Sequence, residues 1–214
     1  MTNYSIESVT VDKDVLDFLM VIYFGVITDP FEAAAFRAYR DFNRTLRFDG
    51  KNADIRLSLR KKATDILQLR ISLLDPEMIR TQGDFDLWHK ESCEKIRQIY
   101  REEKVEFSWG QAQKWLNMTI KYLYIVGSND FTGIFQFCHV PIDNFIFQIA
   151  EKELGIPRLK MAWSRCDDYN EYMAYQKELR SRIKGYDPLR WEFKYWMKEA
   201  RQLAGNTGIN QEEQ

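Results

Sequence analysis

The stretch SWGQAQKWLNMTIKYLYIV, residues 108–126, decides the fold class of this chain. Ser108 and Gln111 form a capping box, in which the serine hydroxyl accepts from the third helical N–H and the glutamine reaches back to the N-cap. Gly127 then ends the helix. Apolar and small residues recur at steps of three and four, which predicts one buried stripe. The members of this stripe are Ala112, Leu116, Thr119, Ile120 and Leu123.

The sequence on both sides of this helix continues with helix signals. Thr28-Asp29-Pro30 and Asp187-Pro188 each place an aspartate before a proline at the first helical position. The turn FDGKN at 48–52 separates two apolar stripes with helical spacing. Ser164-x-x-Asp167 is predicted to cap a tyrosine-rich helix. These signals predict a series of helices joined by short turns.

The fold class that follows is all-α, because we find no alternating strand pattern and no internal repeat. Only IFQFCHV at 134–140 has the composition of a short extended stretch. We expect a single-domain multi-helix bundle over residues 1–204. Residues 205–214 are polar and are expected to form a disordered tail.

Composition and net charge exclude several classes of protein. The 214 residues are 45% hydrophobic and 14% aromatic, which is enough for one sizeable core and excludes a disordered body. The net charge of −1 gives no bulk attraction to nucleic acid. Three widely spaced cysteines and the lack of a secretory signal predict a reduced, cytoplasmic protein. The apolar run Val15–Ile27 is shorter than the roughly 20 residues of a membrane span, so we expect it to be a buried core helix.

Several chemistries lack the residues that they need. The sequence has no G-x-S-x-G nucleophile elbow, no glycine-rich phosphate loop and no H-E-x-x-H motif. With only two histidines and no cysteine pair, we expect no metal site and no cofactor. His89 is expected at the surface or at the boundary of the core. His139 directly precedes V-P-I-D and is the more informative of the two, although a loop histidine with satisfied hydrogen bonds is its ordinary interpretation.

Two helix positions present a lysine and an aspartate. Lys114, with Asn117 and Lys121 at helical spacing, lies on a different face from the apolar stripe. On a solvated face, a substitution of Lys114 is expected to cost within about 0.5 kcal/mol. Asp143 follows 29 residues later, at the start of another helix after residues 140–142. The ordinary structural interpretation is a solvated lysine and an aspartate that caps a helix.

These segments resemble the helix-hairpin-helix DNA glycosylase superfamily. GQAQKWLNM at 110–118 is similar to its hairpin and lysine-bearing helix, and HVPIDNFIFQIA at 139–150 is similar to the segment around its aspartate. The spacing looks most like that of the archaeal 8-oxoguanine DNA glycosylase branch. The hairpin departs from the usual L-P-G-[VI]-G, since this chain has FSWGQ at 107–111, and the four-cysteine iron–sulfur cluster of some members is missing.

The resemblance implies an N-glycosylase, with or without AP-lyase activity, that removes a damaged or modified base from DNA or a nucleotide. Lys114 matches the Schiff-base lysine of the family, and Asp143 matches the catalytic aspartate. The aspartate would stabilise positive charge on the sugar, and the lysine would attack the anomeric carbon as a neutral amine. The base would be flipped into a pocket with aromatic walls. The expected substrate-binding residues are Trp109, Gly110, Gln111, Trp115, Asn117, Lys121, Phe137 and His139.

A second hypothesis is a non-catalytic helical module that keeps a glycosylase-like fold and binds a partner. The altered hairpin favours this module, whereas the pair of Lys114 and Asp143 favours the enzyme. The expected partner is a nucleic acid or a nucleotide and not a membrane; nothing in the sequence indicates the oligomeric state. The basic clusters at 56–62, 95–101 and 180–184 could hold a nucleic-acid backbone if two of them converged around Lys114.

Overall fold

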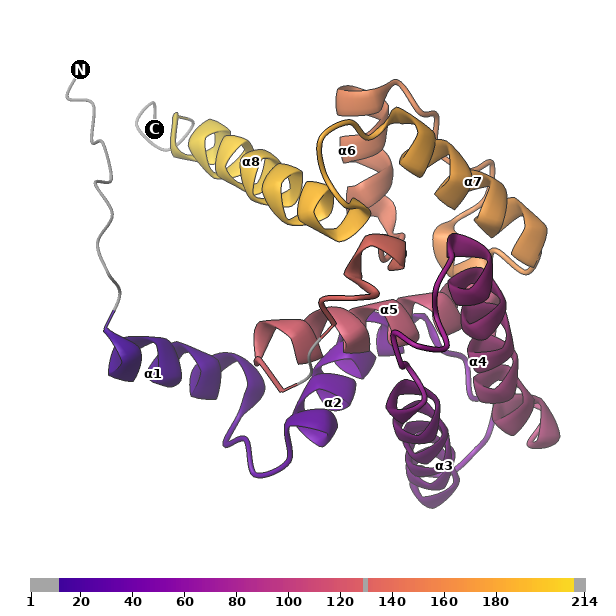
Figure 1. The fold of residues 1–214 in the computed structure, drawn as a ribbon. Coiled ribbons are helices and arrows are strands. Elements are labelled where there is room, and N and C mark those ends of the chain that lie inside the picture. Colours follow the sequence, from indigo (N-terminus) through magenta and orange to yellow (C-terminus); the bar gives the residue numbers. More distant parts are fainter. Residues whose placement is uncertain (1–11, 129–130, 210–214) are drawn as a thin grey trace.

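Helix α5 (Trp109–Ile125) lies at the centre of the fold (Figure 1). The computed structural model describes residues 12–128 and 131–209, and within these ranges every regular element is helical. The all-α prediction is therefore confirmed for the described part of the chain. The other elements are α1 (Lys13–Phe24), α2 (Pro30–Phe42), η1 (Asn43–Thr45), α3 (Ala53–Ser72), α4 (Gln82–Glu102), η2 (Phe135–Phe137), α6 (Asn144–Leu154), η3 (Trp163–Arg165), α7 (Tyr169–Arg182) and α8 (Pro188–Ile209), where η marks a 3-10 helix.

The central helix begins as predicted and is buried more completely than predicted. Ser108 accepts from Gln111 N–H at 3.1 Å, and Gln111 Oε1 accepts from Ser108 N–H at 2.9 Å, so the capping box is confirmed. Every residue from Gly110 to Leu123 is buried, and not only the apolar stripe. The cause is that α2, α4, α7 and η3 all pack on α5 and leave it no solvated face.

Gly110 is the position where η3 comes closest to α5. Its N–H donates to the Cys166 carbonyl at 2.9 Å. A Cβ atom at Gly110 would lie 1.7 Å from the Trp163 carbonyl oxygen. Only glycine allows this approach of η3 to the first turn of α5.

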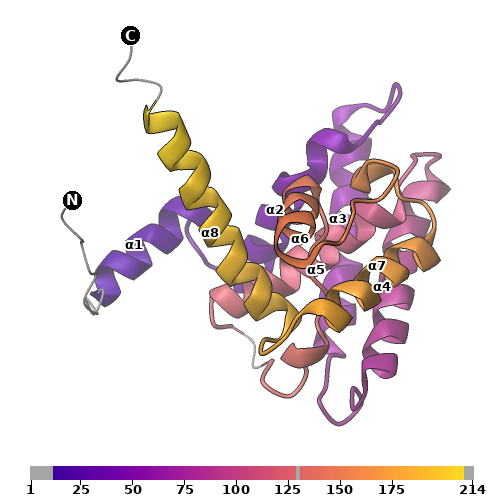
Figure 2. The same cartoon turned by 90° about the horizontal axis from the view of Figure 1, so that it is seen from above.

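The prediction for Val15–Ile27 is half right. The segment forms α1, but that helix has no buried residue, and Phe18 and Ile22 are 63% and 66% exposed. Only its C-terminal end is anchored, where Tyr23 and Phe24 pack edge-on against Tyr122. Figures 1 and 2 show α1 extending away from the other helices. Apolar composition predicted the helix correctly but did not show whether another element covers it.

Three boundaries also differ from the sequence expectations. Residues 134–140 hold the 3-10 helix η2 instead of an extended stretch, and Asp168, not Ser164, caps α7 by accepting from Asn170 N–H at 2.8 Å. Helix α8 continues to Ile209, past the start of the expected tail, and 210–214 lie outside the described residues. Within the described ranges, no helix has both the length and the apolarity that a membrane span requires.

Candidate functional site

The fold brings Lys114 and Asp143 together. Asp143 is the N-cap of α6, and its Oδ1 accepts from Ile146 N–H at 2.9 Å. Its Oδ2 accepts from Lys114 Nζ at 2.6 Å, and the same ammonium lies 3.5 Å from the Pro141 carbonyl oxygen. One carboxylate thus caps a helix with one oxygen and binds a lysine with the other.

The two partners differ in their access to solvent. The Lys114 side chain is 6% exposed, so the expectation of a solvated lysine is wrong, whereas the Asp143 side chain is 26% exposed. Burial by itself would raise the pKa of Asp143, but the Lys114 charge and the hydrogen bonds outweigh it and lower that pKa below its usual value. The site therefore offers an ionised carboxylate at the surface with a cation behind it.

Gln113 holds the two segments of this pair in register. Its Nε2 donates to the carbonyl oxygens of Gly110 and Ile142, both at 2.9 Å, and its Oε1 accepts from Ile142 N–H at 3.2 Å. These bonds fix the amide orientation and tie α5 to the residue just before Asp143. Gln113 could not be singled out from its residue type, because a glutamine within a helix is usually exposed.

Asn117 and His89 continue this network into α4. The fixed Gln113 amide accepts from Asn117 Nδ2 at 3.1 Å, which turns Asn117 Oδ1 towards His89 Nε2, also at 3.1 Å. Tyr169 Oη lies 3.0 Å from His89 Nδ1. His89 is fully buried, so its expected position at the surface or at the boundary of the core is wrong. Burial and the neighbouring ring of His139 lower the pKa of His89 well below its usual value.

His139 is buried between Tyr172 of α7 and Asp86 of α4. The Tyr172 hydroxyl accepts from Gln176 at 3.2 Å and from Asn117 at 3.1 Å, which leaves its own proton for His139 Nδ1 at 2.8 Å. His139 Nε2 therefore carries a proton and donates to Asp86 Oδ1 at 2.8 Å. Burial lowers the pKa of His139 to about 4, although the bond to Asp86 opposes this shift. His139 is a neutral ring that ties α4 to α7 behind the site.

Lys121 does not join Lys114. It lies two turns further along α5 and donates to Glu192 Oε1 of α8 at 2.5 Å. The two side chains are 11% and 3% exposed. Lys121 is among the residues expected to bind substrate, but in the structure its charge is paired with Glu192 and its side chain is enclosed.

The three aromatic residues expected to line the base pocket differ in exposure. Trp115 is fully buried in the core, where it packs against Tyr39 and Phe42, so it cannot contact a substrate. Trp109 is half-buried between Tyr169 and the guanidinium of Arg97. Phe137 is half-buried in η2.

The first turn of α5 is satisfied within the protein. The N–H of Gly110 donates to Cys166, and Gln111 donates through Nε2 to the Thr45 carbonyl oxygen at 3.1 Å. The backbone N–H of Gln111 is used by Ser108 Oγ. These groups are therefore not free to cradle a phosphate in the arrangement that the structure shows.

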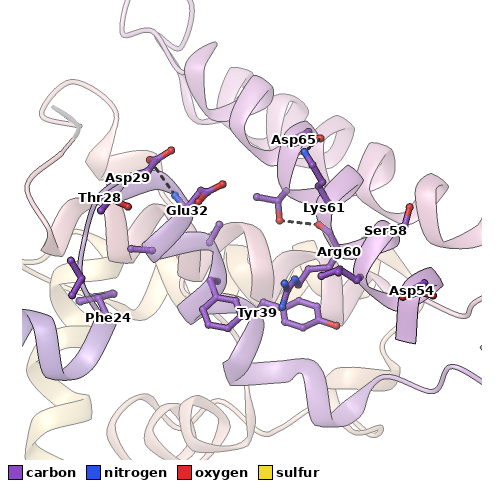
Figure 3. A pocket seen from close by; sticks show the side chains of 16 residues that line it. Phe24, Thr28, Asp29, Glu32, Tyr39, Asp54, Ser58, Arg60, Lys61 and Asp65 are labelled. Carbon is purple, nitrogen blue, oxygen red and sulfur yellow. Dashed lines mark hydrogen bonds and ion pairs between the residues drawn. The ribbon is translucent and has the colours of Figure 1, made fainter. Parts of the chain in front are cut away.

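Two of the hollows on the described surface are lined by several charged side chains, and neither is lined by Lys114 or Asp143. One, of about 740 Å³, lies between α2 and α3 and is lined by four carboxylates and two cations. Figure 3 shows Asp29 and Glu32 on one side of it and Arg60 and Lys61 on the other. The other, of about 790 Å³, lies beside the N-terminal end of α5. Within the described ranges, no group of three or more His, Cys, Asp or Glu side chains is arranged to hold a metal ion. No protein-family model, curated protein or solved structure matches the chain.

Proposed function

We propose that the protein is an N-glycosylase that removes a modified base from DNA or a nucleotide through Lys114 and Asp143. The observation that carries this proposal is the 2.6 Å contact between Lys114 Nζ and an ionised, partly exposed Asp143 carboxylate. A buried lysine paired with a carboxylate at the surface is the arrangement that such a reaction needs.

The chemistry can be written from these two groups. When the N-glycosidic bond breaks, its electron pair goes to the base, and the positive charge left on the sugar is stabilised by Asp143. The Lys114 ammonium gives one proton to the departing base and becomes a neutral amine. That amine then forms a bond to the anomeric carbon, and its nitrogen passes one proton through water to the ring oxygen. The bond between this oxygen and the anomeric carbon breaks as the nitrogen lone pair forms a C=N bond, which leaves a hydroxyl and a protonated imine. In a purely hydrolytic version, water attacks the sugar in place of the amine.

Base release from oligonucleotides tests this proposal. Substrates with oxidised purines or uracil should be offered as single and double strands, with oxidised purine expected first. An abasic oligonucleotide, which has no base to release, tests the lysine step alone. Asp143→Asn should abolish release, because the amide keeps the helix cap and loses the charge. Asp168→Asn is the matched control, since Asp168 caps α7 without an ion pair in the described residues. Equal activity of Asp143→Asn and the wild type would exclude the proposed role of the carboxylate.

A non-catalytic binding module is the second candidate, and one observation favours it. In the first turn of α5, the backbone N–H of Gly110 donates to the Cys166 carbonyl oxygen and that of Gln111 donates to Ser108 Oγ. These two groups are therefore not available as the backbone donors that a phosphate-binding hairpin uses. Nucleic-acid binding without base release from any of these substrates would support the module.

A further inference from the structure

The hollow of about 790 Å³ beside α5 is lined by five arginines from three parts of the chain. Arg44 and Arg47 lie in and after η1, Arg97 and Arg101 lie in α4, and Arg165 ends η3. These arginines lie up to 121 positions apart in the sequence, so the positive charge of the hollow results from the fold and not from a stretch of basic sequence. Ser108 and Gln111 of α5 also line the hollow, which places it one helical turn from Lys114.

Two of these arginines already have partners. The buried Arg97 donates from Nε to the Phe107 carbonyl oxygen at 2.9 Å and pairs with Asp167, while its guanidinium lies over Trp109. Arg101 pairs with Glu94. Arg97 therefore helps to build the wall of the hollow.

The other three arginines have no carboxylate partner, although Arg47 Nη1 lies 3.4 Å from the carbonyl oxygens of Arg44 and Leu46. Arg44, Arg47 and Arg165 are exposed, and none of them forms an ion pair with any residue in the described ranges. Besides Asp167, Glu106 is the only acidic residue that lines the hollow. The lining thus has a positive surplus in a chain whose net charge is −1.

The surplus fits a phosphate-bearing ligand. A guanidinium presents a planar fork of N–H donors that matches two phosphate oxygens, which a carboxylate-lined or neutral hollow does not offer. The hollow between α2 and α3 has the opposite balance, with four carboxylates and two cations, and would repel the same ligand. The positive end of α5 also favours an anion at this place, although its N–H groups are already used.

We propose that the side chains of Arg44, Arg47 and Arg165 bind phosphate groups of a nucleic acid or nucleotide in this hollow. Phosphate binding would be carried by side chains, and not by the backbone of the first turn of α5. That the bound phosphates belong to the molecule whose base is removed at Lys114 rests on the proposed function; the binding itself does not.

Fluorescence anisotropy with undamaged oligonucleotides, single- and double-stranded, tests the proposal over about 50–200 mM salt. The triple variant Arg44→Gln, Arg47→Gln, Arg165→Gln should flatten the log–log salt slope by about 2 on single strands and about 3 on double strands. We expect it to bind at least about tenfold more weakly at the lowest salt. The control Lys13→Gln, Lys160→Gln, Lys177→Gln removes the same charge from exposed positions that line neither this hollow nor the basic clusters. It should leave the slope unchanged.

The source of the phosphate is decided by competition. If inorganic phosphate and a mononucleotide at millimolar concentration displace the oligonucleotide only weakly, the ligand is a polymer. If the wild type binds the mononucleotide as tightly as the oligonucleotide, and the arginine triple variant does not, the ligand is a free nucleotide. The proposal would be overturned if the two triple variants lost the same amount of affinity for the oligonucleotide. It would also be overturned if the folded wild type bound none of the probes.

The outcome separates this inference from the proposed function. Arginine-dependent binding without base release leaves the phosphate site in place and contradicts the glycosylase. Base release that the arginine triple variant does not weaken contradicts the phosphate site and leaves the glycosylase in place. Circular dichroism and urea midpoints of both triple variants check that neither one is unfolded.

Discussion

Helix α5 contributes two lysines, seven residues apart, and each forms an ion pair with a carboxylate from another helix. Lys114 meets Asp143 at 2.6 Å, and Lys121 meets Glu192 at 2.5 Å. The contacts are alike, but the carboxylates are not. Asp143 begins α6 and is 26% exposed, whereas Glu192 lies within α8, is 3% exposed, and its Oε2 has no hydrogen-bond partner in the described residues.

This difference in exposure separates the two pairs. Under the proposed function, a substrate sugar would approach the partly exposed Asp143 carboxylate, to which Lys114 donates. It could not approach Glu192, whose side chain is 3% exposed. The two lysines of α5 therefore differ in whether their carboxylate partner is exposed to solvent or enclosed.

The largest expected effect is on the stability of the enclosed pair. Lys121→Met leaves Glu192 buried and uncompensated, so we expect a loss of about 3–5 kcal/mol in the free energy of unfolding. Urea unfolding measures it. The double variant Lys121→Met, Glu192→Leu should recover most of this loss, because it removes both charges. A loss below about 1 kcal/mol in the single variant would show that Glu192 is not enclosed.

The two ion pairs also differ in the residues around them. Both histidines of the chain belong to the hydrogen-bond network that reaches the Lys114 pair through Gln113 and Asn117, so we expect the stability of the protein to depend on pH. His139 has a native pKa of about 4 against an unfolded value near 6.5, so the unfolded state takes up its proton first as the pH falls. Stability should therefore decrease between pH 6.5 and 4, by about 3 kcal/mol from this residue. His89 adds a loss of the same sign.

Urea unfolding at a series of pH values from 7 to about 4.5 checks this expectation, since that range lies above the usual pKa of the carboxylates. His139→Gln should have a flatter dependence of stability on pH than the wild type. A wild-type stability that is constant across this range would contradict the buried, neutral state of the imidazole.

The smallest expected stability effect is at the open pair. Lys114→Gln should cost about 1–2 kcal/mol, more than a solvated position would and less than Lys121→Met, because water can reach the remaining Asp143 carboxylate. The same urea series compares the two variants. Equal losses for Lys114→Gln and Lys121→Met would remove the distinction between the pairs.

Local signals explain what could be predicted from the sequence. The capping box of Ser108 and Gln111 and the helix start at Asp143 depend on residues close in the chain, and both are found as expected. The pairing of Lys114 with Asp143 came from a resemblance of two short segments. The structure brings those segments within hydrogen-bond distance.

Long-range packing explains what could not be predicted. The amphipathic pattern of α5 indicated a polar face, but that face is also enclosed, and its side chains bond to partners distant in sequence such as Tyr172 and Glu192. His89 is buried for the same reason. Conversely, α1 has an apolar sequence, and no element in the described ranges buries it. The arginine-lined hollow could not be predicted from a sequence pattern, because its residues lie in or beside η1, α4, α5 and η3 and are distant in sequence.

The most direct test of the account is borohydride trapping followed by identification of the modified lysine. The wild type is incubated with borohydride and the abasic and oxidised-purine oligonucleotides, and the adduct is mapped by mass spectrometry of its peptides. We predict that the sugar is attached to Lys114, that Lys114→Gln gives no adduct, and that any variant at Lys121 that remains folded still does. An adduct on Lys121, or an adduct that persists in Lys114→Gln, would contradict the assignment of Lys114 as the reactive lysine.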